Sequence, residues 1–381
     1  MNVVLGFVVG LLWPAAVSAA QPNGAAGSPL TWKQCLNRPS GWYGSIQAVQ
    51  IADNVLLYQR DCGGWPKNID MAAALSDSDK ARLAHDKGRE DATIDNGATC
   101  EQLRYLARVI EAGDADRFRR GFRHGIDYLL AAQYPNGGWP QFYPRAEGYS
   151  RYITFNDNAM INVMSLLRDV SHAKAPYGFV DAQRRDRARA AVERGIDCIL
   201  KCQIVVDGRR LAWCAQHDDK TLKPAGARSY EKPSLSGSES VGIVDFLMRI
   251  DDPSPQIVEA VEAAVKWLDD AKLTGIREVR KPAPGTERGY DKVVVEDKDA
   301  PPLWARFYEI GTNRPIFCSR DGVVRYSLAE ISYERRNGYS WYTDAPASLG
   351  DRYPKWHARW AGSRSARDTG PTQSSEAPPK K

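Results

Sequence analysis

Apolar and polar positions follow one another along the chain in helical patterns that resemble each other. The segments IADNVLLYQ (51–59), GIDYLLAAQ (125–133) and GIDCILKCQ (195–203) each carry an aspartate, then apolar residues, then a glutamine six positions after the aspartate. The segment AVKWLDDAK (264–272) continues the series. Apolar spacing of this kind, recurring at an interval of about 70 residues, predicts stacked helical units.

A second helical pattern, which opens with an acidic residue, follows each of the first three segments. These second patterns occupy residues 93–113, 154–170 and 236–250. In the first of them Leu103, Leu106 and Ile110 lie on one helical face, and Gly113 predicts the end of the helix. We therefore expect each repeat to be a helix, a loop and a second helix.

Two of the loops share a motif of glutamine, three residues, glycine, one residue and tryptophan. It occurs in QRDCGGWP and QYPNGGWPQFYP, and the two tryptophans are 139 − 65 = 74 positions apart. Trp65 is expected to fill the core, with the glycines allowing a tight turn. Around Trp139, the neighbouring Phe142 and Tyr143 suit either the core or stacking on a sugar ring.

A helical hairpin repeated three times, with a period longer than that of the common solenoid repeats, predicts an α/α toroid. In such a ring the inner helices start on one rim, which brings Asp95, Asp157 and Glu239 around the same opening. An acidic residue before a helix is also a common N-cap. The three positions together favour a site, and the sequence leaves open whether Glu239 belongs to it.

The last part of the chain differs in character. Residues 292–342 alternate Val, Tyr, Phe and Ile with Gly and Pro breaks, which predicts short strands and long ordered loops. Residues 362–381 are polar with few apolar side chains, so we expect a disordered tail. Residues 21–361 are predicted to form one folded domain.

The first twenty residues form an apolar run that ends in small side chains, with Val17 and Ala19 at the −3 and −1 positions of a cleavage site. This pattern predicts a secretory signal peptide over residues 1–20. Because no Lys or Arg precedes the apolar run, an uncleaved membrane anchor is the alternative. No later segment reaches the ~20 apolar residues that a membrane span needs. We expect an exported protein with no membrane segment after signal cleavage.

Cysteine content and charge narrow the class of partner. The seven cysteines of an exported chain allow disulfides, with at least one thiol left unpaired, and the sequence does not fix the pairing. The net charge is +5 at pH 7. In an exported protein a mildly basic surface indicates an anionic polymer as partner, and we predict no nucleic-acid partner.

The residue types exclude several reaction classes. The chain contains no P-loop, dinucleotide-binding glycine motif, nucleophile elbow or metalloprotease helix. Its five histidines form no spaced pair, which argues against a histidine-centred mechanism. Carboxylates at helix starts and arginines in ordered loops remain. The carboxylates favour a hard cation such as Ca²⁺, and the arginines favour ligands that carry carboxylates.

Six blocks of sequence carry a closer resemblance. In order between Trp42 and Trp341 they read WYGSIQAVQIADNVLLYQRDCGGWPKN, TIDNGAT, NGGWPQFYP, TFNDNAMINVM, ARSYEKPSLSGSESVGIVDFLM and PLWARFYEIGTNRPIFCSRDGVVRY. These blocks resemble the pectate lyases of polysaccharide lyase family ten. The resemblance implies a mainly α fold, an incomplete α/α toroid facing a cleft, and calcium-assisted β-elimination of polygalacturonate that gives 4,5-unsaturated oligogalacturonates. We expect a secreted monomer.

The resemblance also implies roles for single residues. Asp157 in NDNAM matches the family's calcium-binding aspartate, and Asp95 in DNGAT matches an active-site aspartate that faces the metal and the cleaved bond. Asp95 is therefore predicted to be both catalytic and metal-binding. Arg320 in SRDG falls on the family's proposed catalytic base, with Cys318 and Ser319 standing where a more acidic neighbour is expected.

Substrate-binding residues follow in the same way. Arg228 in ARSYE and Arg306 in WARFYE fall on arginines that contact substrate, and Lys67 follows the first tryptophan loop. Within this interpretation Trp139 and Tyr143 are placed beside the sugar-binding cleft.

An arginine base requires a lowered pKa, since a free guanidinium is almost never neutral. A nearby cation or burial lowers that pKa, and alkaline pH enlarges the neutral fraction. The sequence therefore predicts a rate that rises above neutral pH and is abolished by a calcium chelator.

Two other interpretations remain open. A non-catalytic pectin-binding protein would keep the cleft, but it would not need Arg320, Asp95 and Asp157 together. A terpenoid-cyclase-like α/α barrel enzyme carries similar glutamine and tryptophan turns. The two aspartate pairs beside His or Trp, HDD (217–219) and WLDD (267–270), lack the full acidic pattern of such an enzyme.

Overall fold

The computed structural model describes residues 30–113 and 115–360. The predicted signal peptide (1–20) and the predicted disordered tail (362–381) lie outside these described residues. The described part is mainly α-helical, as predicted. Its α-helices are α1 (Trp32–Cys35), α2 (Ile46–Tyr58), α3 (Asp77–His85), α4 (Cys100–Ala112), α5 (Asp116–Ala131), α6 (Ala159–Ser171), α7 (Ala182–Cys202), α8 (Glu239–Met248), α9 (Pro255–Asp270), α10 (Tyr333–Gly338) and α11 (Arg352–Trp360). Over the same residues, none of the helices is long and apolar enough to cross a bilayer.

The helix predicted first in each repeat is present. The four predicted segments lie in or at the C-terminal ends of α2, α5, α7 and α9. The largest boundary error is in α7, which begins 195 − 182 = 13 residues before the predicted segment. Its first turns carry the charged run QRRDRAR, which faces solvent and hides the apolar spacing.

The strands are short and antiparallel. They are β1 (Ile153–Thr154), β2 (Val205–Val206), β3 (Arg209–Arg210), β4 (Gln216–His217), β5 (Pro224–Ala225), β6 (Leu235–Ser236), β7 (Ile276–Pro282), β8 (Tyr290–Glu296), β9 (Trp304–Ala305), β10 (Phe307–Tyr308), β11 (Phe317–Cys318), β12 (Val324–Arg325) and β13 (Tyr342–Thr343). This confirms short strands in the C-terminal region. The strand-rich region begins earlier than the predicted residue 292, because β7 starts at Ile276 and pairs with β8, Ile276 lying opposite Glu296.

The repeated glutamines join consecutive helical units. Nε2 of Gln59 donates to the carbonyl of Gly63 in its own loop at 2.8 Å and to that of Gly121 in α5 at 2.9 Å. Gln133 and Gln203 each make the same two bonds, to their own loop and to α7 or α9. The glutamine therefore recurs because it satisfies a buried loop carbonyl and a helix carbonyl at once.

Three tryptophans occupy equivalent places in the core. The rings of Trp65, Trp139 and Trp213 are completely buried. Each indole nitrogen donates to a main-chain oxygen of the preceding helix at 2.7 to 2.8 Å, namely that of Val55, Leu129 and Ile199. The prediction that Trp65 fills the core is confirmed. All seven cysteines are free thiols in this structure.

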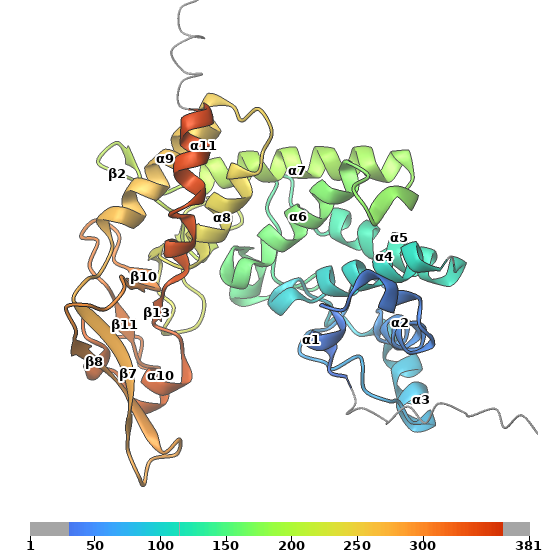
Figure 1. Cartoon of the computed structure of the whole chain (residues 1–381), viewed down its shortest axis with the longest axis horizontal. Helices are drawn as coiled ribbons and strands as arrows, with labels where there is room; N and C mark the ends of the chain where they lie inside the picture. Colours follow the sequence, from blue (N-terminus) through green and yellow to red (C-terminus); the bar gives the residue numbers. More distant parts are fainter. Residues whose placement is uncertain (1–29, 114, 361–381) are drawn as a thin grey trace, which may run out of the picture.

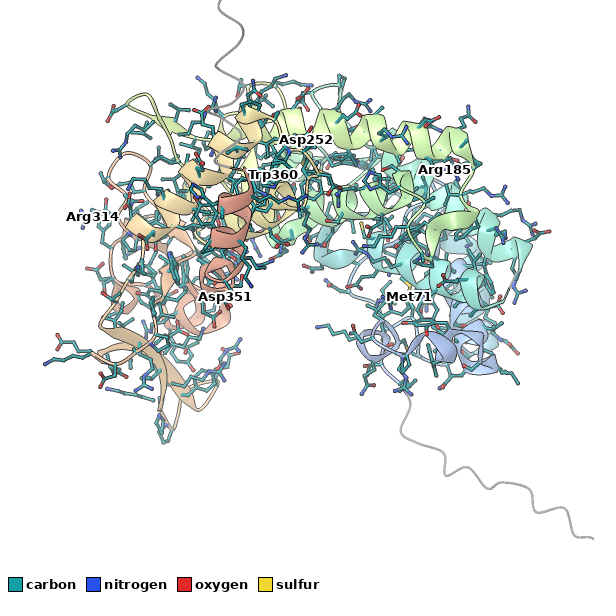
Figure 2. The ribbon with its side chains drawn as sticks, turned by 45° about the horizontal axis from the view of Figure 1, so that its top comes forward. Met71, Arg185, Asp252, Arg314, Asp351 and Trp360 are labelled. Atoms are coloured by element: carbon teal, nitrogen blue, oxygen red, sulfur yellow. The ribbon has the colours of Figure 1, made fainter. Side chains whose placement is uncertain are left out.

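The elements divide between two arms. In Figure 1, helices α1 to α7 form one side, the strands β7 to β13 with α10 form the other, and α8, α9 and α11 lie between them. Figure 2 places Met71 on the helical arm and Arg314 on the strand-rich arm. Of the acidic residues predicted for a site, Asp95 and Asp157 lie in turns before α4 and α6, and Glu239 is the first residue of α8.

Candidate active site

Two similar turns place the predicted acidic residues. Asp95 belongs to a 3-10 turn (Asp95–Gly97) before α4, and Asp157 to a second one (Asn156–Asn158) before α6. Neither carboxylate caps its helix, so the N-cap interpretation is wrong for both residues. Asn96 and Asp157 have positive φ values of 51° each. Non-glycine residues rarely adopt this backbone conformation, which is commonly found at functional sites.

The core tryptophan loops fix the start of these turns. The main-chain oxygen of Trp65 accepts from the N–H of Thr93 at 3.0 Å, and that of Trp139 accepts from Thr154 at 3.1 Å. In the same way Trp213 accepts from Ser236 at 2.8 Å, just before α8. The buried loops therefore fix the positions of the acidic segments at the starts of α4, α6 and α8.

The predicted stacking of Trp139 on a sugar is wrong for this structure. Its ring is completely buried and exposes no face to a ligand. Tyr143 is half-buried against the core, with its ring 5.7 Å from that of Tyr128. Phe142 also lies half-buried, and the Lys67 ammonium lies 5.4 Å from its ring centroid. Trp139 and Tyr143 of the second tryptophan loop thus pack into the core, whereas Phe142 contacts Lys67 of the candidate site.

Lys67 and Asp95 form an ion pair at the rim. Asp95 is only 4% exposed, and its second oxygen, Oδ1, is buried with no hydrogen-bond partner. A cavity of ≈ 590 Å³ adjoins the pair and is lined in part by Lys67 and Asn96. An unpaired buried carboxylate oxygen is costly, which makes Oδ1 a candidate ligand atom.

Arg306 connects the Asp157 turn (Asn156–Asn158) with the start of α8. Its Nη2 atom donates to Glu239 at 2.6 Å, to Asn156 at 3.0 Å and to Asp157 at 3.3 Å. The amide nitrogen of Asn156 in turn donates to the other oxygen of Asp157 at 2.8 Å. The side chain of Asp157 is 45% exposed, whereas that of Arg306 is 12% exposed. Arg306 is therefore a largely buried cation beside Asp157, and the carboxylate of Asp157 is much more exposed than the guanidinium.

Electrostatics keep Arg306 charged. Burial alone lowers its pKa, but Glu239, Tyr339 and Asp157 together raise the pKa above the ordinary arginine value. The guanidinium also lies 4.9 Å from the ring centroid of Tyr339. Tyr339 donates its hydroxyl to Glu231 at 2.7 Å, which extends the polar cluster toward Arg228.

Arg228 and Arg320 both lie near the ring of Tyr230. Their guanidinium carbons are 5.0 Å and 5.9 Å from the ring centroid of Tyr230. Arg228 pairs with Glu231, whose carboxylate accepts from Nε at 2.8 Å. This hydrogen bond raises the pKa of Arg228. The predicted substrate residue and the predicted base therefore lie in one arginine cluster.

Arg320 is exposed and paired. Its side chain is 67% exposed, and Nη2 lies 2.9 Å from Oε1 of Glu334. Glu334 supplies the acidic neighbour that the residues beside Arg320 in sequence lack. The hydrogen bond from Arg320 to Glu334 raises the pKa of the guanidinium. Desolvation and the neighbouring Arg228 lower this pKa, but the pair with Glu334 outweighs them, so the net shift is upward.

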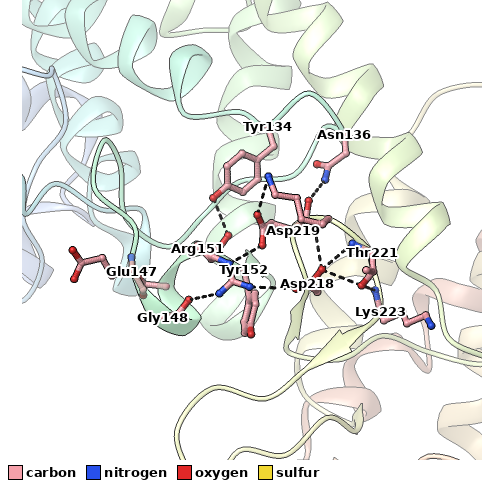
Figure 3. Close-up of polar contacts among 12 residues, drawn as sticks. Tyr134, Asn136, Glu147, Gly148, Arg151, Tyr152, Asp218, Asp219, Thr221 and Lys223 are labelled. Atoms are coloured by element: carbon pink, nitrogen blue, oxygen red, sulfur yellow. Dashed lines mark hydrogen bonds and ion pairs between the residues drawn. The ribbon is translucent and has the colours of Figure 1, made fainter.

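A polar network secures the strands that lead into the Asp157 turn. β1 pairs with β4, and the loop after β4 carries Asp218 and Asp219. Arg151 donates to Asp219 at 3.0 Å and to Asp218 at 3.5 Å, as Figure 3 shows. Tyr134 and Asn136 of the second tryptophan loop bind main-chain oxygens of Arg151 and Asp219. The HDD segment is thus engaged in fold contacts, which removes its support for a cyclase.

The donor set fits a hard cation that keeps open ligand positions. Within residues 30–113 and 115–360, no group of three or more His, Cys, Asp and Glu side chains is arranged to hold a metal. The turns of Asp95 and Asp157 nevertheless contact each other, and they provide an unpaired buried oxygen and an exposed carboxylate. Ca²⁺ takes six to eight oxygen ligands, so a carboxylate ligand and waters would complete its coordination.

Several residues of the cluster were missed in the sequence. Trp213 was not predicted because its spacing from the glutamine differs from that of the other two loops. Trp65 follows Gln59 by six residues, whereas Trp213 follows Gln203 by 213 − 203 = 10 residues, since the β2–β3 hairpin lies between them. Counting from the glutamine without fixing the spacing would have found it. Glu231 lies three residues after Arg228, and this short spacing could have suggested the pair. Glu334 and Tyr339 carry no local sequence signal, since long loops bring them to Arg320 and Arg306.

Comparisons with known proteins agree on one class. The family model described as pectic acid lyase matches residues 59–349. One similar solved structure is a family 10 polysaccharide lyase from Cellvibrio cellulosa, an aspartate-to-alanine mutant in complex with trigalacturonic acid. It is 35% identical to this chain, with a TM-score of 0.73, and the match covers 83% of this chain and 95% of that chain. Another structure of a family 10 polysaccharide lyase from that organism is 34% identical with a TM-score of 0.72, covering 85% and 94%. No protein of curated function matches the sequence.

Proposed function

Since the chain belongs to the pectic acid lyase family and is thus a polysaccharide lyase, we propose that it is a secreted pectate lyase that cleaves polygalacturonate by calcium-assisted β-elimination. One observation carries the proposal. The exposed carboxylate of Asp157 lies in one hydrogen-bonded cluster with Arg306 and Glu239 at the starts of inner helices, beside the Asp95 turn. This set provides oxygen ligands for a hard cation, and the nearby Arg228 and Arg320 provide cations for a polyanionic substrate.

The substrate defines what the site must do. Each galacturonate carries a carboxylate at C6, so the proton on C5 is alpha to a carbonyl group. Removal of that proton requires stabilisation of the negative charge that develops on the carboxylate. Breaking the bond between C4 and the glycosidic oxygen then leaves a double bond between C4 and C5, and the released oxygen takes a proton from solvent.

Asp157, with Oδ1 of Asp95, would hold the calcium ion. When bound, Ca²⁺ supplies a Lewis acid for the substrate carboxylate and a template for its orientation. Asp157 suits this role because its turn presents the carboxylate outward, and Asn156 orients it with a hydrogen bond at 2.8 Å. Lys67 fixes the other carboxylate through its pair with Asp95.

The arginine cluster would bind and deprotonate the substrate. Arg228 would bind a neighbouring carboxylate through paired hydrogen bonds and hold the chain in register. Arg320, in its neutral guanidine form, would accept the C5 proton on a nitrogen lone pair as the C5–H bond breaks, which leaves Arg320 as the guanidinium. Because Glu334 keeps Arg320 protonated in this structure, the proposed role requires a weakened pair with Glu334 in the substrate complex.

Arg228 is a second candidate for the base, on a specific observation. Its guanidinium carbon lies 5.8 Å from the ring centroid of Tyr339, the same ring that Arg306 covers. Arg320 has contacts with Tyr230 and Glu334, one aromatic ring further from Asp157. If Arg228 is the base, then Arg228→Lys lowers kcat far more than Arg320→Lys does.

The remaining features of the proposal follow from the same family membership. Residues 21–361 would form one catalytic domain, an incomplete α/α toroid of about three helical hairpin repeats. The recurrence of the glutamine and tryptophan bonds in three successive loops supports the repeat. The protein would act as a monomer outside the cell or in a periplasm, after loss of residues 1–20.

The experiment that tests this function is product analysis of polygalacturonate digested by the purified protein with calcium. β-Elimination gives oligogalacturonates with an unsaturated end, whereas hydrolysis gives oligogalacturonates that are heavier by one water. Saturated products overturn the proposed reaction. Binding of polygalacturonate without any cleavage indicates the pectin-binding alternative.

A further inference from the structure

Glu239 is more deeply buried than Asp157, the other carboxylate that contacts Arg306. It is 3% exposed at the first position of α8. One oxygen accepts from Nη2 of Arg306 at 2.6 Å, and the other accepts from the hydroxyl of Ser236. Both oxygens are therefore satisfied inside the protein, and Glu239 has no free oxygen to offer a ligand.

The Nη2 atom of Arg306 has more hydrogen-bond acceptors around it than hydrogens to donate. The Nη2 atom carries only two hydrogens, yet three acceptors surround it. Glu239 and Asn156 lie closest, at 2.6 Å and 3.0 Å, and the contact with Asp157 is the longest at 3.3 Å. The two nearer acceptors thus take the two hydrogens, and Asp157 has the weakest interaction with Arg306.

We infer that Glu239 is a positioning residue that holds Arg306 away from Asp157, so that the Asp157 carboxylate stays available to calcium. The inference rests on the proposed function and adds a residue to it. Without the Glu239 carboxylate, Nη2 would turn to Asp157, the nearest remaining anion. A guanidinium paired with Asp157 at full strength would compete with a cation for the same oxygen.

The close packing of α8 against the Asp157 turn keeps this arrangement in place. A Cβ atom added to Gly242 would meet the Asn158 side-chain oxygen at 2.0 Å, so α8 approaches the turn as closely as a glycine allows. Glu239 lies three residues before Gly242 on the same helix. Its carboxylate is therefore carried on a rigid element directly facing the turn that bears Asp157.

The test is calcium binding by isothermal titration in the absence of substrate. Glu239→Gln should weaken calcium binding by about tenfold, because it removes the anion that holds Arg306. The double variant Glu239→Gln with Arg306→Met should recover most of the lost affinity, because the competing cation is also gone. If the double variant binds calcium as weakly as Glu239→Gln, competition by Arg306 is not the cause and the inference fails.

A second variant separates position from charge and is less disruptive to folding. Glu239→Asp keeps the negative charge but shortens the side chain, so it should also weaken calcium binding. Wild-type affinity in Glu239→Asp would overturn the inference. As a matched control, Asp291→Asn removes the carboxylate of another arginine pair, with Arg336, and should leave calcium affinity unchanged.

Failure of the inference is distinguishable from failure of the proposed function. Wild-type protein that binds calcium, together with unaltered binding by Glu239→Gln, overturns the role of Glu239 alone. Wild-type protein that binds no calcium overturns the calcium site and, with it, the inference.

Discussion

Arg320 and Glu334 form a bidentate ion pair, in which Nη2 lies 2.9 Å from Oε1 and Nε lies 3.2 Å from Oε2. The two residues are 334 − 320 = 14 positions apart, and α10 brings the glutamate to the loop of the arginine. Hydrogen bonds from Arg335 and Arg320 lower the pKa of Glu334 to about 2. The proposed base is thus paired with an acid that remains charged at any pH at which the enzyme would work.

Replacing this acid should change the pH dependence of catalysis. In Glu334→Gln the pKa of Arg320 falls, because the hydrogen bond and charge that raised it are removed. The rising limb of the kcat profile should then move to lower pH by about one unit. Asp321→Asn is the matched control, since Asp321 is similarly exposed and pairs with Arg325. An unchanged profile in Glu334→Gln argues that Arg320 is not the base.

The calcium requirement should depend on Asp157. Asp157→Asn removes the exposed charge of the proposed metal site, so half-maximal activity should need at least about tenfold more calcium. Asp53→Asn alters an aspartate of nearly equal exposure that pairs with Arg117, and its calcium requirement should equal that of the wild type. Activity measured over a calcium titration decides the point. Equal requirements in both variants would remove Asp157 from the site.

Trp139 should behave as a core residue. Trp139→Phe loses the indole bond to Leu129 and part of a buried ring, so the free energy of unfolding should fall by about 2 kcal/mol while KM stays unchanged. Trp65→Phe should show the same pattern, because its bond to Val55 is equivalent. Denaturant unfolding and initial rates check both. A raised KM in Trp139→Phe alone would restore the sugar-stacking hypothesis.

The burial of His217 should make stability depend on pH. Its ring is completely buried, Nδ1 lies 2.8 Å from the oxygen of Leu222, and Nε2 accepts from the N–H of Cys214. Burial lowers the pKa of His217 from 6.5 to about 4. Between these values the unfolded chain binds the proton and the folded chain does not, so stability falls as the pH drops below 6.5.

The size of this effect can be measured by urea unfolding. The free energy of unfolding should fall by about 2 kcal/mol from pH 7 to pH 5 through His217. In His217→Gln this part of the slope should disappear, even if the variant is less stable overall. A slope that is identical in the variant would show that other groups cause the pH dependence.

The fold was predictable to the extent that its pattern is local. The glutamine that ends α2, α5 and α7 sits beside an apolar helical run, so both the repeat and the mainly α class could be read from the sequence. The acidic turns were located, but the N-cap interpretation was wrong. Positive φ values at Asn96 and Asp157 depend on the packing of these turns, which spacing does not reveal.

Site residues were predictable only where they lie in a recognisable sequence motif. Asp95, Asp157 and Arg306 follow from the family resemblance, and the structure brings Asp157 and Arg306 together. The burial of Trp139 did not follow, because an aromatic residue next to a turn fits the core and a ligand equally well. Glu334 escaped prediction because its pair with Arg320, 14 residues away, depends on the path of the chain between them. Glu231 lies only three residues after Arg228, so the spacing of that pair was available in the sequence.

The central claim, calcium-assisted β-elimination of polygalacturonate, is tested most directly by ultraviolet absorbance. Purified protein is incubated with polygalacturonate and calcium, a chelator is added during the reaction, and excess calcium is then restored. Our account predicts that the absorbance of the conjugated unsaturated uronate rises, stops with the chelator and resumes with calcium. Cleavage without new absorbance, or a full rate in excess chelator, would contradict it.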